Sequence, residues 1–499
     1  MPVLTIVQNT DRREIPFDGE KLLHDVLQDA GILLDHPCGG KGTCGKCLAD
    51  IRFPGDPLWQ RVKACATPVT QDLQVRTLGG DQLAVLETDQ IPPAQVWDPW
   101  VAQTGDEPVY MAAFDLGTTS LAGFLVSRAG TVARAGMRNP QTQYGADVIS
   151  RVQYALGGGT QALTACVRSA LNKLLGQLCA QAGIHTHQIR AVSLVGNTCM
   201  HHLFLGICPE SLATIPYSPT VTEPMVLRCG DYCLETHPEA QLLMLPVIAG
   251  FVGADTVGCM LACDWEHREE LTLLIDIGTN GEIVLGNRHR SIACSTAAGP
   301  AFEGALISCG MRGAPGAIDH VTLKDGQLVW SVIGGEAPVG ICGSGLIDLT
   351  WVLLQTGKMD ESGRLEAKSY TLPGTDVTLT QKDIRQVQLA KAAITAGIQL
   401  LARQYGVTLE DIDTVCIAGA FGTFMDPDSA CGIGLIPQEL RSKIHPIGNA
   451  AGAGARLPLQ DRSAWERACR IARDTEFLEL ATFRDFQDTY VDALEFPEI

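Results

Sequence analysis

Four cysteines near the N-terminus are spaced like the ligands of a metal centre. Cys38, Cys44, Cys47 and Cys65 are separated by five, two and seventeen residues, and four glycines lie among the first three. Glycine lets the backbone fold closely around a small anionic object and aim N–H groups at its sulfur atoms. Structural zinc also takes four cysteines, but usually from two CxxC-like pairs. The three-plus-one arrangement therefore favours a [2Fe–2S] cluster, with structural zinc as the alternative.

The remaining fourteen of the eighteen cysteines are scattered through apolar segments, and we interpret them as small hydrophobic residues. Cys229 with Cys233, and Cys259 with Cys263, are each four positions apart. Two such pairs can build a metal site, but ordinary thiols are the favoured interpretation.

The sequence D-x-G-T occurs twice, each time between two apolar stretches. The copies are VYMAAFDLGTTSLAGFLV, from residue 109, and LTLLIDIGTNGEIVLG, from residue 271. Aligned on the turn, Asp115 matches Asp276, Gly117 matches Gly278, and Thr118 matches Thr279, with the copies 161 residues apart. An internal repeat of this kind predicts a duplicated half-fold.

The chemistry of these turns suits a nucleoside triphosphate. Glycine allows the backbone to approach phosphate, while threonine hydroxyls and N–H groups donate hydrogen bonds to its oxygens. We predict that Asp115 and Asp276 are catalytic carboxylates that hold Mg²⁺ directly or through its water. Glu282 is a weaker catalytic candidate, because it can equally face solvent on the following strand. The predicted nucleotide-binding residues are Gly117, Thr118, Thr119, Gly278, Thr279 and Asn280.

A third nucleotide element follows much later in the chain. An apolar strand in DTVCIAGAFGTFMD, residues 413–426, ends in Gly419, Ala420, Phe421 and Gly422. Small residues there would let an adenosine lie flat against the backbone; an ordinary strand-to-loop junction is the alternative. The order D-x-G-T, D-x-G-T, apolar-G-A-x-G resembles the actin-like ATPase superfamily, in which ATP lies between two duplicated subdomains.

The first eighty residues have the element order of a β-grasp fold. Residues 3–8 and 13–17 read as strands and residues 20–30 as a helix, and the cysteine-rich loop and two further strands follow. Residues 81–108 are rich in proline and carry Trp97 and Trp100, so we predict a semi-rigid linker. The tryptophans either pack on a neighbouring domain or hold the linker together.

The predicted fold class is therefore an α+β, β-grasp ferredoxin followed by an α/β, duplicated actin-like (ribonuclease H-like) ATPase domain. The predicted ranges are 1–80 for the ferredoxin-like domain, 81–108 for the linker and 109–499 for the ATPase domain. The ATPase domain divides into a first subdomain at 109–265 and a second at 266–499.

A ferredoxin domain fused to an actin-like ATPase resembles the reductive activators of corrinoid proteins. The likeness extends to NPQTQYGADVISRV, VGNTCMHHLFLG, STAAGPAFEGA, CGMRGAPGAID and CGSGLID, and it spans nearly the whole chain. It implies a [2Fe–2S] cluster, ATP and Mg²⁺ as cofactors, and transfer of an electron to Co(II) that regenerates Co(I) for methyl transfer. The implied partners are a corrinoid protein of a methyltransferase system and an upstream electron donor, with a homodimer as a possible assembly.

Three alternatives stay open at this stage. The first is an activator of a radical dehydratase, although those activators hold a [4Fe–4S] cluster and lack an N-terminal ferredoxin domain. The second is a redox-responsive module that binds ATP without turnover, and the third is a fused small-molecule kinase.

Two of the shared segments also allow simpler interpretations. Asp147 either lies near Mg²⁺ or caps the helix that begins at Val148, and the cap is slightly favoured. Asn197, His201 and His202 suggest a metal or cobalt ligand, but local hydrogen bonds are the favoured interpretation.

Composition excludes several other classes of protein. Of 499 residues, 46% are hydrophobic, which excludes disorder as the dominant state. The net charge of −19 gives no general attraction to nucleic acid or to anionic lipid. Because neither a secretory signal nor an unbroken apolar stretch of spanning length is visible, a cytoplasmic protein without a membrane partner is expected.

Overall fold

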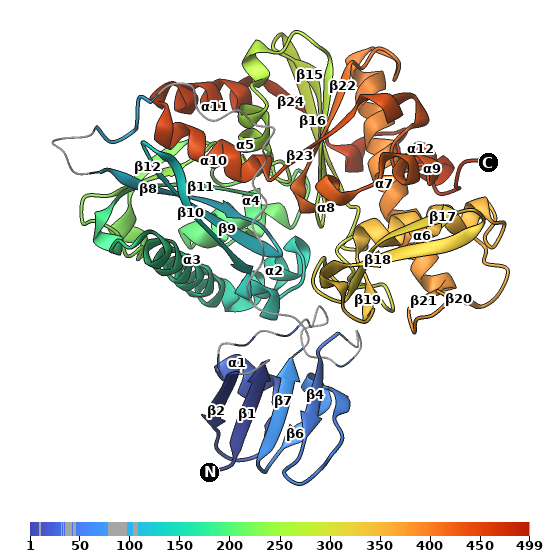
Figure 1. Ribbon diagram of the computed structural model, residues 1–499. Coiled ribbons are helices and arrows are strands. Elements are labelled where there is room, and N and C mark those ends of the chain that lie inside the picture. Colours follow the sequence, from blue (N-terminus) through green and yellow to red (C-terminus); the bar gives the residue numbers. More distant parts are fainter. Residues whose placement is uncertain are drawn as a thin grey trace.

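A computed structural model describes residues 1–8, 11–30, 32, 34, 42, 46–77, 97–102 and 108–498. Three large sheets organise these residues, and Figure 1 shows the small N-terminal sheet below the two larger ones. We call residues 1–77 the N-terminal unit, residues 108–268 the first half and residues 269–498 the second half. No helix in these ranges is long and apolar enough to cross a membrane.

The N-terminal unit is a five-stranded mixed sheet with one helix packed on it. The strand order is β2-β1-β7-β4-β5, and β1 pairs in parallel with β7. Alternation places Leu4 and Ile6 of β1, and Ala49 and Ile51 of β4, in its core, as a half-buried strand requires. The bounds are β1 Val3–Gln8, β2 Asp11–Pro16, α1 Leu23–Asp29, β4 Leu48–Arg52, β5 Gln60–Lys63 and β7 Leu73–Thr77.

This arrangement confirms the predicted β-grasp fold, although the helix is shorter than the predicted range 20–30. Lys21 and Leu22 form the short strand β3, which pairs with β6 (Pro68–Val69). Their backbone is therefore extended, and the helix begins only at Leu23.

The two halves contain sheets in which five strands share one topology. The first sheet has the order β10-β9-β8-β11-β13-β12 and the second β23-β22-β14-β15-β16-β24. In each, three antiparallel strands (β8–β10 or β14–β16) are followed by two strands added in parallel beside the first of them. The internal repeat therefore extends from the turn to five strands of each sheet, as a duplicated actin-like fold requires. The sixth strands differ, since β12 pairs antiparallel with β13 and β24 pairs in parallel with β16.

The bounds of these strands are β8 Tyr110–Leu116, β9 Ser120–Ser127, β10 Gly130–Arg138, β11 Ile189–Gly196, β12 Met225–Arg228, β13 Gln241–Met244, β14 Thr272–Ile277, β15 Gly281–Asn287, β16 Arg290–Thr296, β22 Thr414–Ala418, β23 Ile444–Gly448 and β24 Thr475–Phe477. Two small sheets extend the second half: β17 (Ala317–Lys324), β18 (Gln327–Val332) and β19 (Gly340–Ile341), and β20 (Ser369–Thr371) with β21 (Thr378–Thr380).

The helices of the first half are α2 Val148–Tyr154, α3 Thr160–Ala182, α4 Thr198–Leu205 and α5 Ala254–Ala262. Those of the second half are α6 Gly343–Gln355, α7 Gln381–Tyr405, α8 Gly419–Phe424, α9 Pro427–Gly432, α10 Ala450–Gln460, α11 Arg462–Asp474 and α12 Phe486–Asp492. The longest, α3 and α7, lie on the outer sides of their sheets in Figure 1.

Helices α5 and α10 join the two halves by a close backbone contact. A Cβ atom on Gly454 of α10 would lie only 2.0 Å from the carbonyl oxygen of Gly258 in α5. One hydrophobic core, which includes Val257, Ala451 and Ala455, covers both helices and strands from both large sheets. The relative position of the halves therefore depends on two glycines that let the helix backbones touch.

The described part of the predicted linker is fixed to the two halves. Trp100 packs against Trp465 of α11, with ring centroids 5.6 Å apart, and its indole N–H donates to Gln241 at 2.7 Å. The backbone of Asp98 and Trp100 also donates to the carbonyls of Gln460 and Leu459. The tryptophans therefore pack on a neighbouring domain, and residues 97–101 are not part of a free spacer.

Candidate nucleotide and cluster sites

The turns of the two D-x-G-T hairpins face each other across the halves. Strand β8 leads through Gly117–Thr119 into β9, and β14 leads through Gly278–Asn280 into β15. The hydroxyl oxygens of Thr119 and Thr279 are 3.4 Å apart. A Cβ on Gly117 would lie 2.6 Å from the carbonyl oxygen of Ser120, so only glycine fits this turn. The tertiary structure thus brings together the two predicted phosphate-binding turns.

Carboxyl groups gather behind these turns. Burial, and then the charge of Asp276, raises the pKa of Asp115 to about 7, although Asn449 donates a hydrogen bond to it. Burial also raises the pKa of Asp276 to about 6. Glu282 is paired directly with Asp276 in the β14–β15 ladder, and burial with the charges of Asp255 and Asp276 raises its pKa well above the ordinary value. Its environment is therefore that of the acidic group, not of a solvent-facing strand.

Asp255 belongs to the same group and was absent from the residues predicted for the site. It lies in the first turn of α5, and burial with the charge of Asp276 raises its pKa to about 7. Its sequence signal is weak, because an aspartate in the first turn of a helix is ordinary capping chemistry. Only the packing of α5 against both sheets brings it beside Asp276.

The acidic group fits a magnesium ion that is shared with a nucleotide. Mutual repulsion and burial hold these carboxyls partly protonated, and a divalent cation would relieve both effects. In the described residues no three or more His, Cys, Asp or Glu side chains have the arrangement of a preformed metal cage. Magnesium commonly takes one or two carboxylates and fills its other positions with water and substrate phosphates, so this donor set suits it.

The hydroxyl groups of the threonines in the two turns already have hydrogen-bond partners. Thr279 donates to Glu303 at 2.8 Å, and Thr119 donates to the same carboxylate oxygen at 3.3 Å. Thr118 instead accepts a hydrogen bond from the Asn197 amide at 2.8 Å. Glu303 therefore occupies the hydroxyl donors that a terminal phosphate would require.

Segments that sequence reasoning attached only by resemblance hold the first hairpin in place. The Asn139 amide donates to the Gly117 carbonyl at 2.8 Å, and its backbone N–H donates to the Thr119 carbonyl at 2.9 Å. Arg151, fully buried, donates to the Thr118 carbonyl at 2.5 Å. Burial lowers the pKa of Arg151 to about 10, so it stays charged at neutral pH.

The predicted adenosine-binding residues form the start of α8. Gly419 has a φ of +87°, and a Cβ there would lie 3.1 Å from a carboxylate oxygen of Asp276, so this element adjoins the acidic group. Gly422 packs closely on Ile417. Phe421 stacks on Phe302, with ring centroids 5.3 Å apart, so one face of its ring is already covered. The backbone of Ala420 lies in α8, and its side chain is outside the described residues.

Two of the four predicted cluster ligands can be placed. The sulfur atoms of Cys47 and Cys65 are 3.1 Å apart in the buried interior of the N-terminal unit. Cys38 and Cys44 lie outside the described residues. Burial raises the pKa of the Cys47 thiol, so a bound metal would be needed to hold it as a thiolate. Two adjacent buried thiols at the end of a glycine-rich loop fit an iron–sulfur cluster.

The simpler interpretation holds for Asp147, for His202 and for Asn197, which accepts from the Met200 N–H, whereas Nε2 of buried His201 has no hydrogen-bond partner in the described part of the chain. Asp147 caps α2, and its side chain accepts from the Ser150 N–H at 2.7 Å. His202 contacts the Thr198 carbonyl through Nδ1 and accepts from the Thr220 N–H through Nε2. Both imidazole nitrogens of His202 are therefore engaged by the protein backbone.

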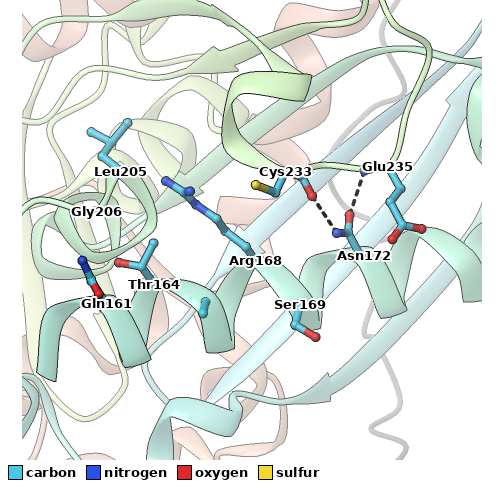
Figure 2. Close-up of a pocket in the computed structure, with 10 residues that line it drawn as sticks. Gln161, Thr164, Arg168, Ser169, Asn172, Leu205, Gly206, Cys233 and Glu235 are labelled. Atoms are coloured by element: carbon cyan, nitrogen blue, oxygen red, sulfur yellow. Dashed lines mark hydrogen bonds between the residues drawn. The ribbon is translucent and has the colours of Figure 1, made fainter.

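A hollow of about 590 Å³ lies elsewhere, along α3 (Figure 2). Its polar side chains bind nearby backbone groups. Arg168 donates to the Phe204 carbonyl, while Asn172 donates to the Cys233 carbonyl and accepts from the Glu235 N–H. These contacts stabilise the outer face of the first half, and the predicted phosphate-binding residues are not among its lining.

Two matched sheets with facing D-x-G-T turns, joined to a β-grasp unit with paired buried thiols, define a ferredoxin fused to an actin-like ATPase. Family models agree along the chain: a 2Fe-2S iron-sulfur cluster binding domain at residues 6–70, the RACo middle region at 110–268, and the C-terminal ASKHA domain of RACo at 270–499. The chain belongs to the RACo family.

Several named proteins resemble it. The corrinoid activation enzyme RamQ of Eubacterium limosum is 32% identical, with 96% of each chain covered. A [Co(II) methylated amine-specific corrinoid protein] reductase of Methanosarcina barkeri is 30% identical over 280 residues, which are 51% of this chain and 52% of that protein. A solved structure of a reductive activator for corrinoid, iron-sulfur protein matches with a TM-score of 0.73 and 29% identity, covering 100% of this chain and 99% of that one.

Proposed function

We propose that this protein uses ATP to drive the one-electron reduction of a Co(II) corrinoid protein to Co(I). The observation that carries the proposal is the union, in one chain, of paired buried thiols in a ferredoxin unit with two facing phosphate hairpins. Full-length similarity to a corrinoid activation enzyme and to a reductive activator for corrinoid, iron-sulfur protein supports it.

The cluster would be held by Cys38, Cys44, Cys47 and Cys65. When bound, it supplies a one-electron carrier, whose potential in plant-type ferredoxins is roughly −400 mV. One electron taken from an upstream donor would leave the protein to cobalt, so no other co-reactant is needed. Since Co(I) requires a very low potential, the electron transfer needs a further source of free energy.

ATP supplies that free energy through differential binding to two states of the protein. Thr119 and Thr279 would donate to its terminal phosphate, and Asp115 and Asp276 would hold Mg²⁺ or its water. Asp255 and Glu282 would orient the attacking water, and Gly419–Gly422 would contact the adenosine. The binding residues otherwise comprise Gly117, Thr118, Gly278 and Asn280.

We further infer a cytoplasmic location, because so many free thiols persist only in a reducing compartment. An upstream electron donor follows from the one-electron stoichiometry. A homodimer, and domain boundaries at residues 80, 108 and 265, stay predictions.

The test mixes chemically reduced, iron-loaded protein with a Co(II) corrinoid protein and follows Co(I) absorbance with and without Mg·ATP. The expected result is Co(I) formation that depends on ATP. Equal Co(I) yield without nucleotide would mean that the ATPase is not coupled to the reduction. Failure with every corrinoid protein, together with ATP-dependent activation of a radical dehydratase, would favour the alternative activator.

A further inference from the structure

The N-terminal unit contacts both halves of the ATPase, through Lys46 and through Gln28 of α1. Lys46, which precedes the ligand Cys47, directs its ammonium at three backbone carbonyls of the second half. It donates to Gly310 at 2.7 Å, to Ser308 at 3.4 Å, and to Ile307. An ammonium has three donors, and hydrogen bonds from a charged donor to carbonyl oxygens are stronger than those between neutral groups.

A second contact lies on the first half. The Gln28 side chain, on α1, donates to the side chain of Gln143. Gln143 belongs to the segment in which Asn139 holds the Gly117 and Thr119 carbonyls of the first hairpin. The N-terminal unit therefore touches one segment next to each side of the proposed phosphate site.

The carbonyl site is connected to the phosphate threonines by a short, tightly packed loop. We call residues 298–311 the sensor loop. Glu303 of this loop accepts from Thr119 and Thr279, and the next residue, Gly304, packs against the backbone of Gly310 and Met311. A Cβ on Gly310 would lie 2.4 Å from the Gly304 carbonyl oxygen, so the two glycines are in close backbone contact. This contact is a direct route by which we infer that a displacement of Glu303 reaches the Gly310 carbonyl that accepts from Lys46.

The sensor loop is anchored at one point and strained at another. The N–H and hydroxyl of Ser308 both donate to Asp383, the buried residue that completes the capping box of α7 with the N-cap Thr380. Leu306 has a left-handed backbone with φ of +64° and a side chain 54% exposed. A non-glycine residue in that conformation stores backbone strain, which rearrangement of the loop would release.

We propose that the carbonyls of Ile307, Ser308 and Gly310 form a docking site for Lys46, and that ATP opens this site by displacing Glu303 from Thr119 and Thr279. The proposal rests on the proposed function only in requiring that ATP binds at the two hairpins. A terminal phosphate needs the same hydroxyl donors as Glu303 and repels its carboxylate, so both cannot occupy the site. The docked N-terminal unit is thus the resting state, and ATP frees the cluster loop for a partner.

Linkage makes this proposal measurable without any corrinoid protein. If ATP weakens docking, then loss of docking must strengthen ATP binding by the same factor. In full-length, iron-loaded protein, K46M should bind a non-hydrolysable ATP analogue with Mg²⁺ at least about threefold more tightly than the wild type. The matched control is K63M, which removes an exposed lysine close to Cys65 and should bind as the wild type does.

Hydrogen–deuterium exchange reports the contact itself. The analogue should raise exchange in peptides that cover residues 46–53 and 304–311 of the wild type, and K46M should show the raised exchange without nucleotide. E303A removes the competing carboxylate from the other side of the contact and should tighten analogue binding in the same direction. If K46M binds less iron, E303A still tests whether Glu303 competes with the analogue, and the exchange of the wild type tests the docking contact.

The outcomes separate the two hypotheses. Wild-type affinity in iron-loaded K46M, or exchange in residues 304–311 that the analogue does not change, would overturn the docking proposal and leave the proposed function intact. Failure of the wild type to bind the analogue would instead overturn the nucleotide site.

Discussion

At the scale of single residues, the acidic group behind the two hairpins combines chemistry with a stability penalty. Asp115, Asp255, Asp276 and Glu282 come from both halves, and burial raises the pKa of each. Such perturbed carboxyls are frequent where a protein binds a metal ion and a phosphate group. The same burial that prepares them for a cation disfavours their charged form in the nucleotide-free protein.

Replacing Asp276 with asparagine should remove a negative charge that positions Mg²⁺ or the attacking water. We expect kcat for ATP hydrolysis to fall by about 100-fold or more, with the visible spectrum of the cluster unchanged. Steady-state phosphate release at saturating Mg·ATP measures the effect. The matched control is D376N, an exposed aspartate of the same half, and wild-type turnover in D276N would remove Asp276 from the mechanism.

Replacing Asp255 with asparagine should stabilise the nucleotide-free protein at high pH. An unfolded aspartate ionises near 3.8, whereas Asp255 ionises at about 7 in the folded protein. Between these values the folded state binds more protons, so stability falls as the pH rises toward 7 and stays low above it. Asparagine avoids this loss, and its side-chain oxygen can still accept the hydrogen bond that Thr256 donates to Asp255.

Thermal unfolding without nucleotide or Mg²⁺ tests whether the substitution raises or lowers stability. At pH 8 the free energy of unfolding of D255N should exceed that of the wild type by on the order of 1 kcal/mol or more. D255N should therefore unfold at a higher temperature. It should match the wild type near pH 3, where the carboxyl is mostly neutral in both states. A difference of the same size at both pH values would show that repacking, and not charge, is responsible.

At the scale of elements, the contact between α5 and α10 sets the position of one half against the other. Both helices present small residues, and the backbones touch at Gly258 and Gly454. Asp255 lies in the first turn of α5, and Asn449, which binds Asp115, caps α10. The spacing of these two helices therefore also positions two side chains of the acidic group.

Replacing Gly454 with alanine should separate these helices. The new methyl group would lie 2.0 Å from the Gly258 carbonyl oxygen, and backbone cannot yield as a flexible side chain does. We expect a loss of about 1–3 kcal/mol of stability and slower ATP hydrolysis. The control is G176A in α3, where nothing lies within 4 Å of the new Cβ and helix propensity predicts a gain of up to about 1 kcal/mol. Equal behaviour of the two variants would contradict the tight contact.

At the scale of the whole molecule, the N-terminal unit has its own hydrophobic core. That core consists of residues from Leu4 to Val75, and the cores of the two halves contain none of them. Units with separate cores and few direct contacts respond nearly independently to mutation. Coupling between cluster and nucleotide must then pass through local contacts such as those of Lys46.

Replacing Cys65 with serine should consequently remove the cluster and spare the ATPase. We expect iron well below two atoms per chain and loss of the EPR signal of the reduced protein, with unchanged hydrolysis at saturating ATP. C233S, at an exposed cysteine, should retain its iron. Full iron content in C65S would require a different fourth ligand, and stoichiometric zinc in anaerobically prepared wild type would replace the cluster assignment.

Local pattern in the amino-acid sequence was sufficient to predict much of the secondary structure and many of the candidate site residues. Strand alternation and helix periodicity depend on neighbours in the chain, so β1, β4, α1 and the two hairpins could be predicted from it. The matched pair Asp115 and Asp276 followed from the repeat, since a duplicated half-fold places equivalent residues at equivalent turns. Cysteine spacing within one loop likewise constrained the ligands without knowledge of the rest of the fold.

Tertiary structure alone decided which distant residues share one site. Neither Asp255 nor Glu303 has a sequence pattern that marks it as a site residue. The packing of α5 brings Asp255 beside Asp276 and Asp115, and the sensor loop brings Glu303 to Thr119, which is distant in the chain. Lys46 contacts carbonyls more than 260 positions away, and backbone carbonyls carry no sequence signature at all. Which distant residues come into contact depends on how whole sheets and helices pack. That packing results from many contacts together, and no short stretch of sequence encodes them.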